Sequence, residues 1–584
     1  MRKGAEILAD ELAVNGAEIV YHVPGESFLT ALDSLTTRHP RIRSISCRHE
    51  NGAAQMAEAY GKLTGKPGIA FVTRSPGATN AVNGVHTAFQ DSSPMILIVG
   101  QVKRSILERE AFMSYDFRTM FAPMAKWVGQ IDDPARIPEF VQRAWATALS
   151  GRRGPVVLVV PEDVLEEKCD VAPSARPAVA SHAGAPREED LDRIFAMLAA
   201  AAKPLVVVGG SGWSETARED VQRFATNLGL PVVTTFRRRD IIDHRLDCYV
   251  GEIGIGSNPT LLAHIREADF ILMLNDALSD VNTIGAGYME GFTLFSIPRP
   301  RQRVVHVMPD HGDLNRVFQV DLALAADNDA TARALAGRSA TPRAEHADWT
   351  STLRATLMKE REPQPCPGAI DLPGVMGWLR ERLPEDAIVT NGVGAYATWS
   401  QRYFPHYRLH TQLGPISGSM GYSLPAAISA KIAHPDRVVV EFVGDGCFQM
   451  SSEELATAVQ YGVNIVIVLF NNGLYGTIRI HEENRLEGRV NGTELTNPDF
   501  LLLAKAYGAH GERVTCTKEF APAFERCLAA GKPALIELVV IRKPSTAATR
   551  SAICVPAAQR GYPTRNNHLR QHLVRARRLP EIIE

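Results

Sequence analysis

The chain has 584 residues, 45% of them hydrophobic, and its 63 basic residues nearly balance 65 acidic ones, for a formal net charge of −2. At roughly 100 to 200 residues per domain, this length predicts about three domains. A near-neutral charge provides no global field that would attract nucleic acid or a membrane surface. The cysteines show no CxxC spacing, and no apolar run approaches the roughly 18 residues that span a bilayer. We therefore expect a cytoplasmic protein with reduced thiols and with neither a nucleic-acid nor a membrane partner.

Short apolar runs alternate with helical patterns along the whole chain. The runs predicted as strands are 68–72, 95–99, 155–160, 205–208, 270–274, 304–307, 438–443 and 465–470. Apolar runs bounded by Gly and Pro and separated by helix-length segments favour parallel sheets that are covered on both faces. The predicted fold class is α/β, with doubly wound parallel sheets.

Three stretches rich in Pro, Ala and small residues interrupt this alternation and are predicted as linkers: 169–186, 337–348 and 363–367. They divide the chain into an N-terminal domain (1–167), a central domain (188–336) and a C-terminal domain (368–545). The remaining tail, 546–584, is rich in Arg and His and lacks a clear apolar period. We interpret it as a basic C-terminal extension that is poorly ordered or covers a partner.

Residues 443–473 read VGDGCFQMSSEELATAVQYGVNIVIVLFNNG, with an acid after one predicted strand and two amides after the next. The pattern Ser451-x-x-Glu454 matches a capping box that would begin a helix, and Gly462 is placed to end it. A strand, a helix and a second strand form a crossover whose two strands run parallel, so both polar clusters lie at the same edge of one sheet. We therefore expect Asp445 and Asn472 to face one site.

A carboxylate and an amide oxygen are too few ligands for a dedicated metal cage. They suit Mg²⁺, which prefers hard oxygens and completes its coordination with water and the phosphates of a ligand. The glycines on both sides of Asp445 let phosphate oxygens approach the backbone, and the amino end of the next helix favours negative charge. The pattern predicts a metal-bridged diphosphate site at the carboxyl edge of the sheet.

GDG followed by NN at this spacing resembles the signature of thiamine diphosphate (ThDP) enzymes. Residues 48–102, RHENGAAQMAEAYGKLTGKPGIAFVTRSPGATNAVNGVHTAFQDSSPMILIVGQV, resemble the pyrimidine-binding domain of the acetolactate synthase-like family. The resemblance covers nearly the whole chain. It implies a central domain without the active site, a C-terminal diphosphate-binding domain and a cofactor-activating role for Glu50. A carboxylate bonded to the pyrimidine nitrogen N1′ favours the tautomer whose neighbouring nitrogen removes the C2 proton, so Glu50 would act as a relay.

The resemblance also implies which residues bind the cofactor and the metal. In the N-terminal domain the expected cofactor-binding residues are Pro24, Gly25, Glu50, Thr73, Gly77 and Asn80. In the C-terminal domain they are Gly394, Ala395, Tyr396, Gly418, Ser419, Met420, Gly444, Asp445, Gly446, Cys447, Asn472, Leu474, Tyr475 and Gly476, of which Asp445, Asn472 and Leu474 would bind the metal. Met420 matches the apolar residue that supports the thiazolium ring, and the Gly418 carbonyl matches the acceptor for the exocyclic amine. Since the family builds each site from two subunits, a homodimer or homotetramer is implied.

The resemblance weakens at the flavin site and at the substrate pocket. Acetolactate synthases usually bind FAD in the central domain with an arginine in a GARFDD-like segment, and here LNDALSD places Ala277 at that position. We interpret the glycine-rich turn at 208–212 as tight strand-to-helix packing and expect no stoichiometric FAD. The residues matched to the substrate pocket are Ser27, Phe112, Met113, Lys126, Ile478 and His481. Met113 stands where the synthases have glutamine, and His481 where they have tryptophan.

We therefore predict a ThDP- and Mg²⁺-dependent enzyme that cleaves a carbon–carbon bond next to the carbonyl of a small 2-oxo acid or related compound and then ligates the product. A simple decarboxylase or carbon–carbon lyase without ligation is the alternative. Two other classes remain open: a non-catalytic binding protein with this fold, and a nicotinamide or flavin oxidoreductase that uses the central domain. The sequence does not identify the donor or the acceptor.

Overall fold

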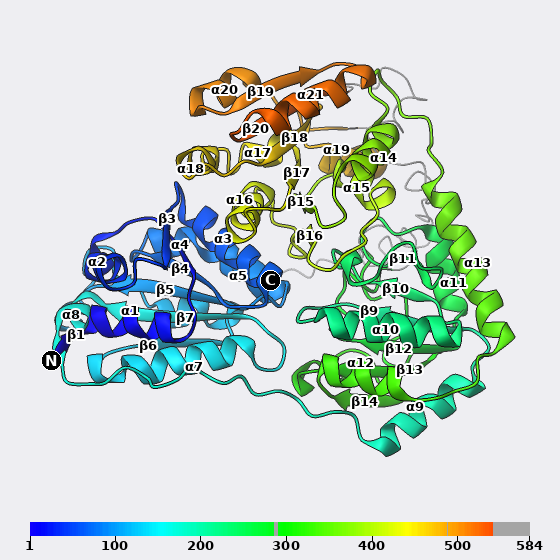
Figure 1. The fold of residues 1–584 in the computed structure, drawn as a ribbon, viewed down its shortest axis with the longest axis horizontal. Coiled ribbons are helices and arrows are strands. Elements are labelled where there is room, and N and C mark those ends of the chain that lie inside the picture. The colour runs from blue at the N-terminus through cyan, green and yellow to red at the C-terminus, as the bar shows by residue number, and fades with distance from the viewer. Residues whose placement is uncertain (285–289, 487–488, 541–584) are drawn as a thin grey trace, which may run out of the picture.

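The apolar runs form the strands of three six-stranded sheets, in each of which all the strands run parallel (Figure 1). The computed structural model describes residues 1–284, 290–486 and 489–540. The predicted C-terminal extension, 546–584, lies outside the described residues. Each sheet is flanked by helices, so the chain has the predicted α/β class with three doubly wound domains.

The N-terminal domain has the strand order β3-β2-β4-β5-β7-β6. Its strands are β2 (Ile19–His22), β3 (Arg43–Ser46), β4 (Gly68–Val72), β5 (Met95–Gln101), β6 (Trp127–Gln130) and β7 (Pro155–Pro161). Its helices are α1 (Gly4–Val14), α2 (Leu29–Arg38), α3 (Glu50–Thr64), α4 (Gly77–Asn80), α5 (Val82–Gln90), α6 (Phe117–Phe121), α7 (Ile137–Leu149) and α8 (Glu162–Glu166). A short antiparallel ladder joins β1 (Arg2–Lys3) to β8 (Lys168–Cys169). Every residue of β4, β5 and β7 is buried, which explains why these central strands appear as unbroken apolar runs.

The central domain has the order β11-β10-β9-β12-β13-β14. Its strands are β9 (Pro204–Val208), β10 (Val232–Thr234), β11 (Tyr249–Glu252), β12 (Phe270–Leu274), β13 (Arg303–Met308) and β14 (Leu322–Ala325), and its helices are α9 (Glu188–Ala200), α10 (Glu215–Leu228), α11 (Pro259–Glu267), α12 (Asn328–Gly337) and α13 (Ala344–Arg361). The start of α13 corrects one prediction: of the expected linker 337–348, only the part between α12 and α13 is irregular. Residues 344–348 are helical despite their small residues, because α13 buries Trp349 and Leu353 against the domain.

The C-terminal domain has the order β16-β15-β17-β18-β20-β19. Its strands are β15 (Ile388–Asn391), β16 (Gln412–Leu413), β17 (Val439–Gly444), β18 (Val466–Asn471), β19 (His510–Val514) and β20 (Ala534–Val539). Its helices are α14 (Leu372–Arg382), α15 (Ala397–Tyr403), α16 (Ser423–Ala433), α17 (Asp445–Phe448), α18 (Glu454–Gln460), α19 (Gly476–Arg485), α20 (Phe500–Tyr507) and α21 (Thr517–Ala529).

The N- and C-terminal domains pack directly against each other. Helix α3 lies along α16, and a single apolar cluster runs through both domains, with Met56 and Ala57 on one side and Ala427 and Ile428 on the other (Figure 1). Tyr21 and Ser429 share a hydrogen bond of 2.8 Å across this contact. Because the apolar contact is continuous and hydrogen bonds cross it, the two domains form one packed body.

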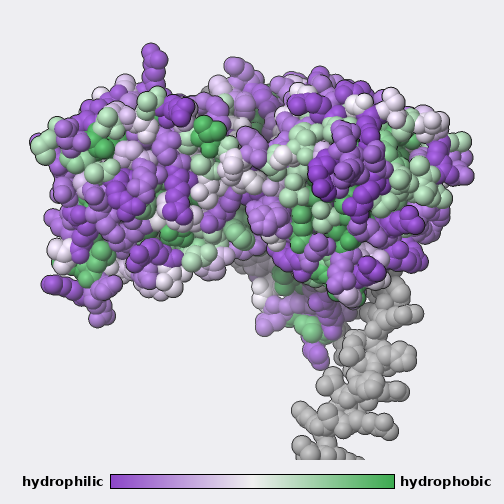
Figure 2. All heavy atoms as spheres, turned by 90° about the horizontal axis from the view of Figure 1, so that it is seen from below, coloured by the Kyte–Doolittle hydropathy of each residue, from purple (hydrophilic) through white to green (hydrophobic). Residues whose placement is uncertain are grey.

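The exterior contrasts with these buried sheets. Figure 2 shows one face of the molecule, on which hydrophilic residues predominate and hydrophobic ones occur in separate patches. Across the described residues, the structure has no helix that is both long enough and apolar enough to cross a membrane.

Candidate functional site

Asp445 lies at the carboxyl end of β17, where it begins α17. Its Oδ2 accepts hydrogen bonds from the Gly473 amide and from Nδ2 of Asn497, both at 2.7 Å, and its Oδ1 accepts one from the Gly446 amide at 3.0 Å. Burial raises the pKa of this carboxyl, whereas the three hydrogen bonds oppose the rise. The turn after β17 and the loop after β18 therefore meet at one sheet edge, as parallel strands require.

The loop after β18 presents further oxygens beside Asp445. Oδ1 of Asn472 accepts a hydrogen bond from the Leu474 amide at 3.0 Å. Asn497, which sequence reasoning missed, donates from Nδ2 to Asp445 at 2.7 Å and to Oδ1 of Asn471 at 2.8 Å. The segment around Asn497 carries no motif, and only the fold brings it here. The loop thus carries side-chain amide oxygens, those of Asn471 and Asn472, near a buried carboxylate.

These donors fit Mg²⁺ bound through a diphosphate. Within the described residues there is no group of three or more His, Cys, Asp or Glu that could hold a metal, so a cation here would need oxygens from water and phosphate. The glycines on both sides of Asp445 let two tyrosine rings pack closely against the turn. A Cβ on Gly444 would lie 2.7 Å from Cε1 of Tyr396, and a Cβ on Gly446 would lie 2.6 Å from Cε1 of Tyr475. Bare backbone is therefore needed on both sides of the carboxylate.

The loop 392–396 packs against this turn. The Cys447 thiol donates to the Val393 carbonyl at 3.0 Å. Tyr396 is buried and stacks on Phe470, with ring centroids 5.6 Å apart, and burial raises the pKa of its phenol. A Cβ on Gly394 would lie 2.6 Å from the Tyr396 ring. Gly394 and Ala395 thus lie near the Asp445 turn, whereas the Tyr396 side chain packs as part of the core.

The segment 418–420 is connected to the N-terminal domain. Oγ of Ser419 accepts hydrogen bonds from Gln55 at 3.0 Å and from Asn83 at 2.8 Å. Gly418 has a φ of +76°, and a Cβ there would meet no atom within 4 Å. Met420 is half-buried against the core shared by the two domains. Open space at Gly418 leaves room for a bound group beside its backbone.

Glu50 is the first residue of α3. Its carboxylate accepts a hydrogen bond from Nδ2 of Asn80 at 2.9 Å, and a Cβ on Gly77 would lie 3.2 Å from its Oε1. Nearby, Gly25 approaches Thr73 so closely that a Cβ would lie 2.3 Å from the Thr73 Cβ. The loop after β2 thus carries the expected residues Pro24 and Gly25, the loop after β4 carries Thr73, and the short helix α4 carries Gly77 and Asn80. In the described part of the chain, no hydrogen bond or ion pair joins Glu50 to Asp445.

The residues matched to a substrate pocket have different environments. The side chains of Phe112 and Ile478 are exposed, Met113 has a φ of +65°, and His481 is half-buried, with its pKa lowered by burial. Ser27 is buried and hydrogen-bonded to Thr73 at 2.9 Å. Nζ of Lys126 donates to the carbonyls of Thr147 at 2.6 Å and Ser150 at 2.5 Å, and burial lowers its pKa to about 8. The polar atoms of Ser27 and Lys126 are thus already bonded to protein groups.

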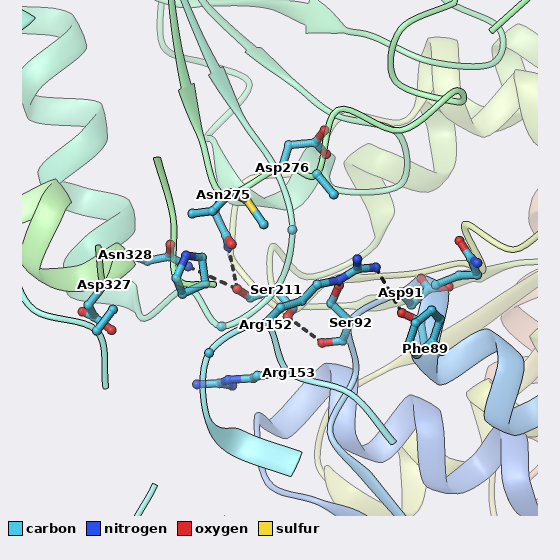
Figure 3. Close-up of a pocket in the computed structure, with 18 of the residues that line it drawn as sticks. Phe89, Asp91, Ser92, Arg152, Arg153, Ser211, Asn275, Asp276, Asp327 and Asn328 are labelled. Carbon is cyan, nitrogen blue, oxygen red and sulfur yellow. Dashed lines mark hydrogen bonds between the residues drawn. The ribbon is translucent and has the colours of Figure 1, made fainter. Parts of the chain in front are cut away.

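A cavity of about 170 Å³ lies between the central and N-terminal domains, next to the glycine-rich turn after β9 (Figure 3). It is lined by Gly210, Ser211 and Gly212, by Asn275, Asp276 and Ala277, and by Arg152 and Arg153. A Cβ on Gly210 would lie 2.1 Å from the Asn275 carbonyl, so the turn is tightly packed. Drug-sized ligands occupy pockets of about 300–1,000 Å³. The cavity is smaller than such pockets, and Ala277 stands in it where the synthases have an arginine.

The chain thus carries a hard-oxygen set on a glycine turn in one α/β domain and a carboxylate at a helix start in another. Both features are typical of enzymes that bind a diphosphate cofactor. Models of thiamine pyrophosphate enzymes match the chain three times: the N-terminal TPP binding domain at residues 2–120, the central domain at 191–335 and the C-terminal TPP binding domain at 392–538.

Similar proteins extend this match over most of the chain. The large subunit of acetolactate synthase from Corynebacterium glutamicum is 30% identical over 558 residues, covering 92% of this chain and 86% of that protein. The large subunit from Lactococcus lactis is 31% identical over 550 residues, with 92% of each chain covered. The isozyme 2 large subunit from Escherichia coli is 29% identical over 540 residues, covering 92% and 95%. The chain belongs to the acetolactate synthase-like family of thiamine diphosphate enzymes.

Proposed function

We propose that the chain is a ThDP- and Mg²⁺-dependent enzyme that decarboxylates a small 2-oxo acid and joins the remaining fragment to a second carbonyl compound. The observation that carries the proposal is the meeting of the Asp445 turn with the loop 471–474 at one sheet edge. When bound, ThDP supplies a C2 carbanion that adds to a carbonyl carbon and accepts electrons as the neighbouring bond breaks. Membership of the family and similarity to acetolactate synthases support this chemistry.

The residues of this chain would hold the cofactor and move one proton. Asp445, Asn472 and the Leu474 carbonyl would bind Mg²⁺, whose charge neutralises the diphosphate. Glu50 would hold a proton at the pyrimidine nitrogen N1′, and Asn80, which donates to Glu50 at 2.9 Å, would orient the carboxylate. Asp445 is buried, which excludes water and strengthens the hydrogen bonds that it accepts, whereas Glu50, Asn80 and Asn472 are half-buried.

We further propose that two copies of the chain form the complete site. Within the described residues of one chain, Glu50 and the Asp445 turn share no hydrogen bond or ion pair. Phe112 is 83% exposed and Ile478 is 54% exposed, and both are matched to a substrate pocket. A second copy that covers these side chains would bring the two halves of the site together.

A decarboxylase or lyase without ligation is the second candidate. Two observations favour it: the synthases' glutamine is replaced by Met113, and Nζ of Lys126 is already bonded to the carbonyls of Thr147 and Ser150. A pocket with these changes would recognise an acceptor differently from that of a synthase.

We propose that the enzyme works without FAD, and the cavity between the central and N-terminal domains is consistent with this proposal. Its volume of about 170 Å³ is below that of ordinary ligand pockets. Ala277 replaces the arginine of the synthases' segment, and the guanidinium groups in the lining, those of Arg152, Arg153 and Arg316, come from other positions.

The proposal is tested by incubating the purified protein with ThDP, Mg²⁺ and a panel of 2-oxo acids, alone and in pairs, and identifying the products by mass spectrometry. Products that join two fragments would support carboligation, and aldehydes alone would support the second candidate. If no 2-oxo acid is consumed under saturating ThDP and Mg²⁺, the proposed function is wrong.

A further inference from the structure

Helix α18 of the C-terminal domain contacts the segment that leads into α3 in the N-terminal domain (Figure 1). Glu454, the first residue of α18, is fully buried, and its Oε1 accepts hydrogen bonds from the backbone amides of Arg48 at 3.0 Å and His49 at 2.9 Å. Glu50 is the next residue along the chain. The carboxylate thus bonds to the backbone immediately before the proposed activating residue.

The contact is built from both sides. The Thr457 hydroxyl donates to Oε2 of Glu454 at 2.6 Å and so orients the carboxylate. On the other side, Gly52 leaves room for it, since a Cβ on that residue would lie 2.2 Å from Oε1 of Glu454. Burial raises the pKa of Glu454, and the amide donors oppose the rise by stabilising the ionised form.

Two further bonds extend the contact along the same segment. The Tyr461 hydroxyl, just after α18, accepts from the Ser46 amide at 2.8 Å, and Oε1 of Gln460 accepts from the Arg48 guanidinium at 2.5 Å. His49 in turn caps α3, because its Nδ1 accepts from the Asn51 amide at 3.1 Å. Of the four backbone amides before Glu50, those of Ser46, Arg48 and His49 are therefore fixed by α18 and the residue that follows it.

We propose that Glu454 is a positioning residue that fixes the start of α3 and, through it, the place of the Glu50 carboxylate. The inference rests on the proposed role of Glu50. Glu454 lies on the helix that follows the Asp445 turn, so one element connects the metal-binding turn to the activating carboxylate of the same chain. If each site takes Glu50 from one copy and Asp445 from the other, α18 links the two sites of a dimer.

The test compares Glu454→Ala and Gly52→Ala with the matched control Glu453→Ala. Glu453 precedes Glu454, and its side chain makes no capping hydrogen bond. The measurement is the C2 proton–deuteron exchange rate of ThDP bound at saturation with Mg²⁺, followed by NMR after acid quench. Calorimetry gives the ThDP affinity of each variant, and thermal unfolding gives its stability.

We expect exchange to slow by about 10- to 100-fold in Glu454→Ala and in Gly52→Ala, since a shift of about 1 Å in a catalytic group has an effect of this size. Exchange in the double variant that combines Glu454→Ala with Gly52→Ala should be no slower than in Glu454→Ala, because removing the carboxylate also removes the clash at residue 52. Glu453→Ala should stay within about twofold of the wild type. A purely structural role would lower stability while leaving the exchange rate of the bound cofactor unchanged.

Unchanged exchange in Glu454→Ala at saturating ThDP would overturn the inference. If Glu454→Ala fails to fold, Glu454→Gln is measured in its place, because the amide keeps one acceptor oxygen for the two backbone donors. Exchange at the wild-type rate in both Glu454→Gln and Gly52→Ala would then overturn the inference. Glu50→Gln separates the two proposals. If Glu50→Gln also leaves exchange unchanged, the proposed relay itself fails, whereas slowing in Glu50→Gln alone refutes only the role of Glu454.

Discussion

Replacing Asp445 with alanine removes the only carboxylate of the proposed metal site. The Asp445 side chain accepts hydrogen bonds from Gly446, Gly473 and Asn497 and is 2% exposed. Even the loss of a residue that only hydrogen-bonds to a metal ligand weakens metal binding by about 10- to 100-fold. We therefore expect ThDP to bind Asp445→Ala at least about 100-fold more weakly in the presence of Mg²⁺, or about 2.7 kcal/mol.

Calorimetric titration of both proteins with ThDP, with and without Mg²⁺, measures this effect. The wild type should bind more tightly with Mg²⁺, and the variant should lose that dependence. The variant also leaves three donors without their acceptor, so apoprotein stability should fall by about 1–3 kcal/mol, which thermal unfolding checks. If the folded variant keeps wild-type affinity and the same response to Mg²⁺, the reasoning about the site is refuted.

Three further predictions concern the rest of the molecule. Burial raises the pKa of Glu441 to about 8, whereas the same group titrates near 4.5 in the unfolded chain. Between these pH values the native state keeps a proton that the unfolded chain has released. The free energy of unfolding should therefore fall as the pH rises through this range, by up to about 1.4 kcal/mol per pH unit. Glu441→Gln should flatten that slope in thermal unfolding, and an unaltered slope would contradict it. Lys62→Met leaves Asp91 buried without its cation and should lower the free energy of unfolding in urea by about 3–5 kcal/mol. The control Lys66→Met removes an exposed pair with Glu18 and should lower it by less than about 1 kcal/mol. Equal losses in the two variants would show the reasoning to be wrong. The visible spectrum of the purified protein should lack an oxidised-flavin band, and a band near one equivalent per chain would show that the central domain binds FAD in another way.

The sequence predicts the buried centre of each sheet better than its edges. Strands such as β5 and β12 are covered on both faces, so their apolar runs are continuous and mark them clearly. Edge strands such as β3 and β19 have exposed and charged positions, and no apolar run marks them. The sequence also misplaced the start of α13, which lies inside an expected linker, because burial against another element outweighs local composition.

The candidate site shows a similar division. The meeting of Asp445 with the loop after β18 follows from parallel strands and could be predicted. The predicted capping box at Ser451 and Glu454 is wrong. Helix α18 begins at Glu454, and its N-cap residue Glu453 makes no side-chain capping bond. The buried Ser451 hydroxyl has no hydrogen-bond partner among the described residues. Glu454 instead bonds to the amide of His49, 405 positions earlier in the chain. A local pattern cannot reveal such a distant partner.

The C2 proton–deuteron exchange rate of bound ThDP in Glu50→Gln tests the account most directly. Glutamine keeps the size of the side chain and can still form a hydrogen bond, but it lacks the carboxylate that would hold a proton at N1′. The cofactor should therefore bind, as calorimetry can verify, while exchange slows by at least about 100-fold, within the range of about 10²- to 10⁴-fold for general acid–base catalysis. Product formation should fall with it. Exchange at the wild-type rate in the saturated variant would contradict the central claim that Glu50 activates the cofactor.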